Sequence, residues 1–335
     1  MATRRSGEGL GSERGTGAAP SGSRRPELDD WLNARLFHPA ARRLAAGLAG
    51  TPVTPNMVSV GGGLLIVAAG IFYTRLAWPA SVLLGFAAHA LWHVLDGADG
   101  DLARLTGKAS PVGEIVDGVC DYFGHIVVYV LLAAFLAGRI GGGAWAIAAV
   151  AGASRILQSN HAESNRRTYL WRVYNIPWLK QVYEAGEPAL RRGVAARLLE
   201  PLARLYVGLA AAGEPLSGRL DLMIERSAAA GPAAREQAAR LCREESRLPL
   251  RLQTLLGANG RTVALGLSMA AGSPLWFFLL EATLLNLLLA FSASLQRAAD
   301  RRILAKWGRQ MGTVTVCPGT RTNGDGNYLS GYADK

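Results

Sequence analysis

Long apolar runs are the feature that most constrains how this chain of 335 residues can fold. Nearly all of them lie in residues 57–74, 77–95, 126–153 and 258–291. A soluble protein spreads its apolar residues along the chain, whereas a bilayer core needs about 20 apolar residues for each spanning helix. Several of these runs come close to that length once their polar ends are counted. The sequence therefore predicts an integral, multi-pass membrane protein.

The apolar runs divide into six segments, which predicts an all-α protein with six transmembrane helices. The six predicted spans are 57–74, 77–103, 112–138, 142–165, 258–273 and 274–297. No apolar run starts near Met1, so we expect no cleaved signal peptide. Three cysteines, at positions 120, 242 and 317, provide neither a disulfide framework nor a paired metal motif.

The net charge of +11 is distributed unevenly between the connections. Arginines are frequent before the first span, in the connection that holds Arg104 and Lys108, in 166–257 and after the last span. The alternate connections carry few or none. Because Lys and Arg collect on the cytoplasmic side, we expect both termini in the cytoplasm. As partners we expect membrane lipids and no nucleic acid.

The segments outside the spans are predicted from composition and periodicity. Residues 28–50 place Trp31, Leu36 and Leu44 near helical spacing with arginines between them, which favours an amphipathic helix on the membrane surface over an ordinary soluble helix. Thr54 is the expected N-cap of the first span, with Pro55 in its first turn. The predicted organisation is a disordered basic arm at 1–27, the surface helix at 28–50, spans one to four within 51–165, a cytoplasmic basic helical insertion at 166–257, spans five and six within 258–305, and a polar tail at 306–335.

Carboxylates gather where the second predicted span ends and the third begins. Residues 96–104 read DGADGDLAR, and after a short connection with Gly107 and Pro111 the chain continues GEIVDGVCD. At 100° per residue, Asp96 and Asp99 share one helical stripe, and Asp117 and Asp121 share another. Two helices joined by a short turn can therefore face each other with four carboxylates between them. Asp101 points away from this stripe, and Glu114 is expected to face away too.

Four carboxylates in a low-dielectric site repel one another unless cations are present. Oxygen ligands of this kind suit hard divalent ions such as Mg²⁺ or Mn²⁺, and two such ions about 4 Å apart can clamp a pyrophosphate group. The neighbouring glycines have no side chains, so a nucleotide can approach the backbone closely. Arg104 could pair with phosphate oxygens. The plainer alternative, solvated helix ends, explains one Asp pair more easily than two pairs on adjacent helices, because intramembrane acids are costly and usually functional.

The complete pattern is D96-x2-D99-G100-x2-A103-R104-x8-G113-x3-D117-x3-D121. At all eight defined positions it resembles the signature of the CDP-alcohol phosphotransferase (CDP-alcohol phosphatidyltransferase) family. The six spans, the preceding surface helix and the TPN at 54–56 are also similar to that family, over 28–165 and 258–305. The segment between the fourth and fifth spans is longer than in compact members of the family, and nothing about it carries over.

The resemblance implies a reaction and roles for individual residues. An alcohol would attack the β-phosphorus of a CDP-linked donor, releasing CMP. Two metal ions would be held by Asp96, Asp99, Asp117 and Asp121, with Asp121 as the general base. The CDP pocket would be lined by Asp99, Gly100, Ala103, Arg104 and Gly113. The resemblance further implies a homodimer in the bacterial inner membrane, with a cytoplasmic active site.

The acceptor is left open by this signature. The fourth predicted span carries polar residues, and Arg155, Gln158 and His161 are the candidates for holding a polar or phosphorylated acceptor. This weakly favours CDP-diacylglycerol as donor to a water-soluble alcohol over transfer of a CDP-linked head group to a lipid hydroxyl. A divalent-cation transporter is the alternative of another class, although no matching acidic pair lies deeper in the spans. A scaffold without activity is disfavoured because the signature is intact.

Four further polar residues in the spans have structural interpretations. His125 follows Asp121 by four residues and His93 precedes Asp96 by three. A hydrogen bond between helices is favoured for both, with orientation of Asp121 as the alternative for His125. Glu281 and Asn286 in the sixth predicted span are expected to hydrogen-bond between helices.

Overall fold

The computed structural model of the chain describes residues 26–176 and 216–314, and these ranges contain helices and no strand. Residues 1–25 of the predicted arm, 177–215 of the predicted insertion and 315–335 of the predicted tail lie outside the described residues. The all-α prediction is therefore confirmed for the described part of the chain.

Helices form at all six predicted positions. They are α2 (Pro55–Arg75), α3 (Ala80–Leu105), α4 (Pro111–Ile140), α5 (Gly143–Tyr174), α10 (Ala258–Ala270), and the pair α11 (Leu275–Ala282) and α12 (Leu284–Val314). Three stretches among the described residues are long and apolar enough to cross a membrane: Pro55–Arg75, Val112–Ile140 and Leu275–Gln310. An integral membrane protein is thus supported, while the number of six spans stays a prediction.

The first long helix begins as its sequence predicts. The Thr54 side chain accepts a hydrogen bond from the backbone N–H of Met57, and Pro55 occupies the first turn. Thr54 is therefore the N-cap of α2. Ser110 caps α4 in the same way, accepting from the backbone N–H of Gly113 at 3.0 Å.

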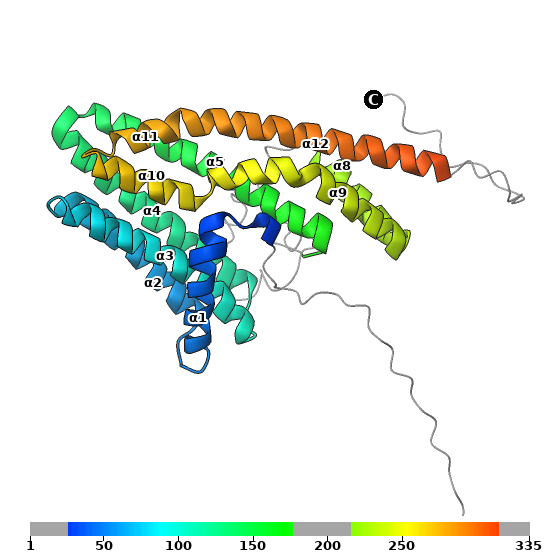
Figure 1. Cartoon of the computed structure of the whole chain (residues 1–335), viewed down its shortest axis with the longest axis horizontal. Coiled ribbons are helices and arrows are strands. Elements are labelled where there is room, and N and C mark those ends of the chain that lie inside the picture. The colour runs from blue at the N-terminus through cyan, green and yellow to red at the C-terminus, as the bar shows by residue number, and fades with distance from the viewer. Residues whose placement is uncertain (1–25, 177–215, 315–335) are drawn as a thin grey trace, which may run out of the picture.

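Glycines bring α2 and α4 into close contact. A Cβ added at Gly63 would lie 3.2 Å from the backbone oxygen of Cys120, and one added at Gly124 would lie 3.2 Å from the backbone oxygen of Gly63. Small residues at a helix interface let two backbones approach one another in this way. The approach fixes the face of α4 that carries Asp117 and Asp121, and α3 packs against α2 beside it (Figure 1).

Most of the segment predicted as a surface helix is helical. The chain is helical over Asn33–Phe37 and α1 (His38–Leu48). Ala41 and Ala45 are fully buried against Val58, Ala98 and Leu102, whereas Trp31 and Leu36 are exposed. Small alanines thus pack α1 against α2 and α3, with Leu44 and Leu48 against the same cluster, whereas Trp31 and Leu36 point outward. Its position on a membrane surface stays a prediction.

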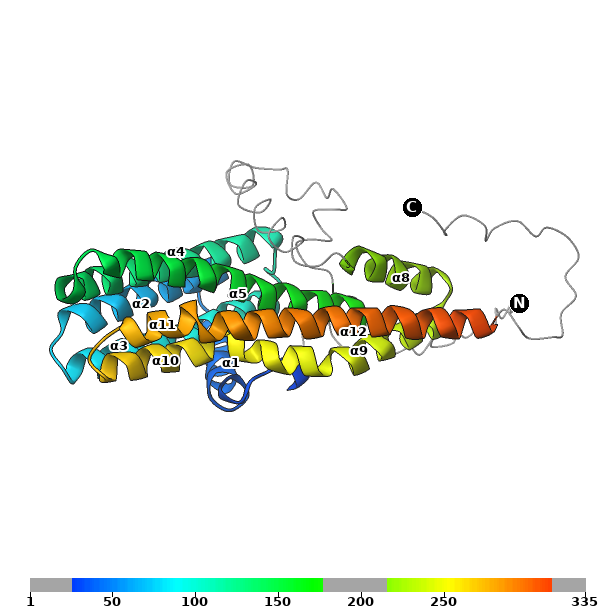
Figure 2. The ribbon, with the colours of Figure 1, turned by 90° about the horizontal axis from the view of Figure 1, so that it is seen from above.

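Two helices extend beyond the ends of the predicted spans. The fourth predicted span stops at 165, but α5 continues to Tyr174, and α12 continues to Val314 through residues assigned to a polar tail. The reason is a second hydrophobic core, separate from the one between the apolar helices. It is formed by the ends of α5 and α12 with α8 (Ser217–Ala229) and α9 (Pro232–Gln253). Figure 2 shows α9 and α8 running along α12. Packing within this bundle supports helix beyond the apolar residues of both spans.

Candidate active site

The turn between α3 and α4 places the two acidic stripes opposite one another. Gly107 lies in the turn with a φ of +66°, a conformation that a glycine adopts without strain. The Ser110 cap then starts α4 close to the end of α3. Asp117 and Asp121 consequently lie one turn apart on α4, facing Asp96 on α3.

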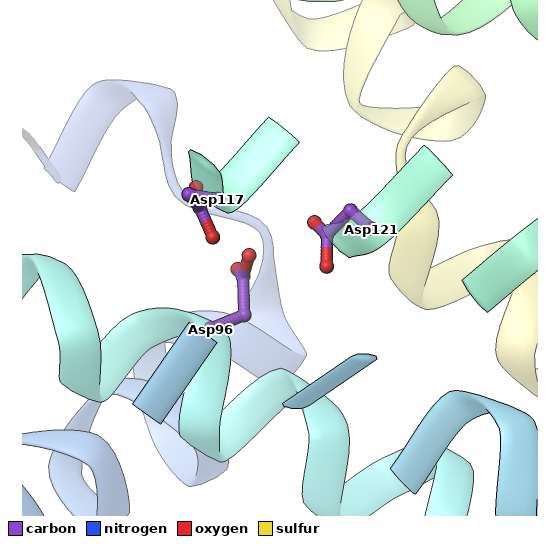
Figure 3. Close-up of side chains that lie close together, drawn as sticks. All are labelled: Asp96, Asp117 and Asp121. Carbon is purple, nitrogen blue, oxygen red and sulfur yellow. The ribbon is translucent and has the colours of Figure 1, made fainter. Parts of the chain in front are cut away.

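Three carboxylates converge across this turn. One oxygen from each of Asp96, Asp117 and Asp121 lies within 4.8 Å of the other two, and Figure 3 shows the three side chains pointing toward a common space. All three residues are partly exposed, so the space between them can be reached from solvent. A cluster of oxygen ligands at this spacing fits a hard divalent cation, because carboxylates are the protein ligands that Mg²⁺ and Mn²⁺ prefer.

Asp99 is buried beside this cluster and is held by other groups. Its Oδ2 accepts a hydrogen bond from the Ser59 hydroxyl at 2.5 Å, and its Oδ1 accepts one from the backbone N–H of Gly100 at 2.5 Å. The sequence grouped four aspartates, and the structure collects three of them in one cluster. A role for Asp99 as a fourth ligand stays a prediction. Ser59 was missed because its position on α2 becomes informative only once α2 is placed against α3.

The residues expected to line a CDP pocket lie around the same turn. Arg104 donates a hydrogen bond to Asp101 at 2.5 Å, and its side chain is 40% exposed. A Cβ added at Gly100 would lie 3.4 Å from the guanidinium of Arg104, and one at Gly113 would lie 3.5 Å from the side chain of Asn56. Asp101, predicted to point away from the acidic stripe, is the partner that orients Arg104. Ala103 follows on α3, one turn beyond Gly100.

The two histidines behave differently. His93 contacts the Thr262 hydroxyl of α10 at 2.9 Å, which confirms the predicted bond between helices. For His125 that prediction is wrong, since its Nδ1 donates within α4 to the backbone oxygen of Asp121 at 2.8 Å. The intrahelical bond forms because a carbonyl four residues earlier lies directly below the ring.

The first turns of α4 are tied to α5 by ion pairs. Arg167 pairs with Glu114, and it also donates to Glu163 at 2.5 Å. Arg166 adds two hydrogen bonds to Glu163, both 2.8 Å long. Glu114 thus faces α5, away from the aspartates, as predicted. These pairs hold the end of α4 that carries Asp117.

Two of the three candidates for acceptor binding, Arg155 and Gln158, belong to a buried polar network. Glu281 on α11 has no solvent exposure and lies 3.0 Å from Arg261 and 3.8 Å from Arg155. Arg261 donates to Gln158 at 2.7 Å, and Gln158 in turn donates to Asn286 at 2.8 Å. The predicted interhelical roles of Glu281 and Asn286 are confirmed. Arg261 was missed because its surroundings in the sequence are those of an ordinary span end.

The three acceptor candidates differ in how accessible their side chains are to a ligand. Gln158 is fully buried and its amide is engaged on both sides. His161 contacts the Ser292 hydroxyl at 3.1 Å. Arg155 keeps a 14% exposed side chain and lies over the ring of Tyr129. Arg155 and His161 are partly exposed and Gln158 is not, so only the first two are accessible to a ligand.

The described helices and the carboxylate cluster define a helical membrane protein with an acidic site at the end of its apolar helices. Residues 52–175 match the model of the CDP-alcohol phosphatidyltransferase family, a family of transferases for substituted phosphate groups. The match confirms the family assignment made from the eight-position signature, and the enzyme class with it. It covers α2 to α5 and all four aspartates of the signature, whereas α8 to α12 lie beyond it. A comparison with curated proteins finds no match.

Proposed function

We propose that this protein is a phospholipid-biosynthesis enzyme that transfers a phosphatidyl group from CDP-diacylglycerol to an alcohol hydroxyl, with release of CMP. The observation that supports it best is the convergence of Asp96, Asp117 and Asp121 at the joined ends of two apolar helices, within the region matched by the family. A lipid-borne CDP group and a water-soluble alcohol can meet at such a position.

The donor set of the cluster fits two divalent cations, Mg²⁺ or Mn²⁺. Asp96, Asp117 and Asp121 provide oxygen ligands only, and Asp99 is adjacent to them. Such ions, when bound, stabilise the negative charge that develops on a transferring phosphoryl group and on its leaving group. The protein's contribution is to hold the carboxylates of α3 and α4 at ligand distance before substrate arrives.

Side chains around the cluster have distinct parts in this proposal. Asp121 takes the proton of the acceptor hydroxyl as it attacks the donor phosphorus, since it lies at the inner end of the α4 stripe. Arg104, steered by Asp101, pairs with phosphate oxygens of CDP. Gly100, Ala103 and Gly113 leave room for the nucleotide to approach the backbones of α3 and α4.

The buried network supports a polar, negatively charged acceptor. Two guanidinium groups, of Arg155 and Arg261, surround the single carboxylate of Glu281. A phosphate or carboxylate on the acceptor would balance the excess positive charge, and Arg155 is the accessible member of the pair. This favours a water-soluble alcohol acceptor over a lipid hydroxyl.

The proposed orientation rests on the charge distribution, and the proposed homodimer rests on the family resemblance. The active site faces the cytoplasm of a bacterial inner membrane, with six spans, both termini cytoplasmic, and two copies of the chain in a homodimer. Fusion of a reporter enzyme to each terminus tests the orientation, and crosslinking in native membranes tests the dimer.

The decisive experiment presents purified protein with radiolabelled CDP-diacylglycerol, Mg²⁺ or Mn²⁺, and a panel of alcohols with and without phosphate. We expect CMP release that depends on one class of alcohol and is abolished by chelation. Release only when a CDP-linked head group and a lipid alcohol are supplied would replace the proposed donor. Metal uptake into vesicles without CMP release under any condition would overturn the proposal.

One variant separates binding from chemistry. Asp121→Asn keeps the shape of the side chain and removes its basicity, so we expect retained CDP-diacylglycerol binding and loss of turnover. Glu236→Gln, an exposed carboxylate on α9, is the matched control. Loss of donor binding with turnover intact would contradict the role given to Asp121.

A further inference from the structure

One buried side chain contacts the proposed base directly. Trp92 lies on α3, one turn before Asp96, and is 4% exposed. Its indole Nε1–H donates a hydrogen bond to Oδ1 of Asp121, with 2.8 Å between nitrogen and oxygen. This bond crosses from α3 to α4 and ends on one of the three clustered carboxylates.

The indole is held in place on several sides. Its ring lies 4.3 Å from the ring of His93 and 4.8 Å from that of His125, which it meets nearly edge-on. On the α2 side, a Cβ added at Gly62 would lie 3.3 Å from the indole Cδ1. The ring therefore fits a space bounded by three helices, and it cannot turn without displacing its neighbours.

The chemistry of the indole makes this contact directional. An indole nitrogen is a donor only, so the Asp121 oxygen that faces it must accept. The bond fixes the rotation of the carboxylate about its terminal torsion, which is otherwise broad. With one oxygen held by Trp92, the orientation of the other is fixed too, because both oxygens lie in one plane with the carboxyl carbon.

We propose that Trp92 is a positioning residue for the transfer reaction, holding the Asp121 carboxylate so that its second oxygen faces the acceptor hydroxyl. The inference rests on the proposed function and deepens it. Trp92 touches neither substrate nor phosphate and acts through Asp121. Groups that orient a reacting side chain in this way are typically worth about 10-fold to 100-fold in activity.

Trp92→Phe tests this assignment, because it keeps an aromatic ring in the space and removes the N–H. We expect kcat to fall about 10-fold to 100-fold, with KM for CDP-diacylglycerol changed less than about 3-fold and the thermal unfolding midpoint close to that of the wild type. Trp145→Phe is the matched control, since Trp145 on α5 is 47% exposed. An unchanged kcat would overturn the positioning role. A lower kcat together with a raised KM and a lowered unfolding midpoint would also overturn it.

A spectroscopic measurement tests the contact without relying on turnover. The chain has eight tryptophans, so ¹⁵N-indole labelling gives eight N–H signals, and the one absent in Trp92→Phe belongs to Trp92. We expect that signal to move in Asp121→Asn and to stay in place in Glu236→Gln. A signal that does not respond to Asp121→Asn would overturn the inference. A responding signal in a protein that releases no CMP would instead overturn the proposed function and leave the contact established.

Discussion

Two regions of this molecule place ionisable groups among apolar helices, and they arrange the charges in opposite ways. Between α3 and α4, three carboxylates converge on one space. Between α5, α10 and α11, the single carboxylate of Glu281 lies against two guanidinium groups. The first region accumulates charge of one sign, and the second brings opposite charges together inside the protein.

The difference indicates which region is prepared for cations from outside. Like charges in a low-dielectric setting raise the free energy of the folded protein until a counter-charge arrives. The Glu281 carboxylate already has guanidinium partners within the protein, and Arg261 also donates hydrogen bonds to Gln158 and Ser159. The acidic region is therefore expected to gain stability from added cations, and the Glu281 network to lose stability when its own carboxylate is removed.

The largest expected effect is on activity at the acidic region. Asp117→Asn replaces one carboxylate of the cluster by a neutral amide, so we expect turnover to fall by about 100-fold to 1,000-fold. Without divalent ions the variant should unfold no earlier than the wild type, because repulsion is relieved. With Mg²⁺ its unfolding midpoint should rise less than that of the wild type, since binding to the folded state is what stabilises. CMP release and thermal unfolding in detergent measure the two effects. If Mg²⁺ stabilised both proteins equally, the claim that the acidic region gains stability from added cations would be contradicted.

The second effect is on stability at the buried network. Glu281→Gln leaves Arg155 and Arg261 without their carboxylate, and breaking a buried pair in this way costs about 3–5 kcal/mol of the free energy of unfolding. Replacing Glu281 and Arg261 together by Met should cost less than the single change, because the nearer of the two guanidinium groups is then removed along with its carboxylate. Thermal unfolding of both variants, with Glu236→Gln as control, tests this. A Glu281→Gln protein as stable as the wild type would remove the distinction between the two regions.

The smallest effect is expected outside the apolar helices, at Glu245 on α9. Hydrogen bonds from Lys306 and Arg302 of α12, each 2.6 Å long, lower the pKa of this carboxyl below its ordinary value. A lowered folded-state pKa adds stability above the unfolded-state value of about 4.3 and loses it as the pH falls through the folded-state value. Glu245→Gln should therefore lower the unfolding midpoint slightly at pH 7, and the difference from the wild type should shrink below about pH 4. A difference that grows on acidification would contradict the pairing.

The acidic site could be predicted closely from the sequence because its geometry is local. Asp117 and Asp121 share a face by helical periodicity alone, and the Thr54 cap depends only on the residues that follow it. The short turn through Gly107 and Ser110 then brings α3 and α4 together. Each of these features depends on neighbours within a few residues.

What the sequence determined by itself is the helical class, the apolar character of the helices and the stripes that carry the aspartates. Only the tertiary structure decided that Asp99 is held by Ser59, that Trp92 contacts Asp121, and that Arg261 joins the Glu281 network. It also decided that α5 and α12 continue into a second core with α8 and α9. The physical reason is the distance along the chain: these contacts join side chains from different helices, and their partners are set by how whole helices pack and not by the spacing within any one of them.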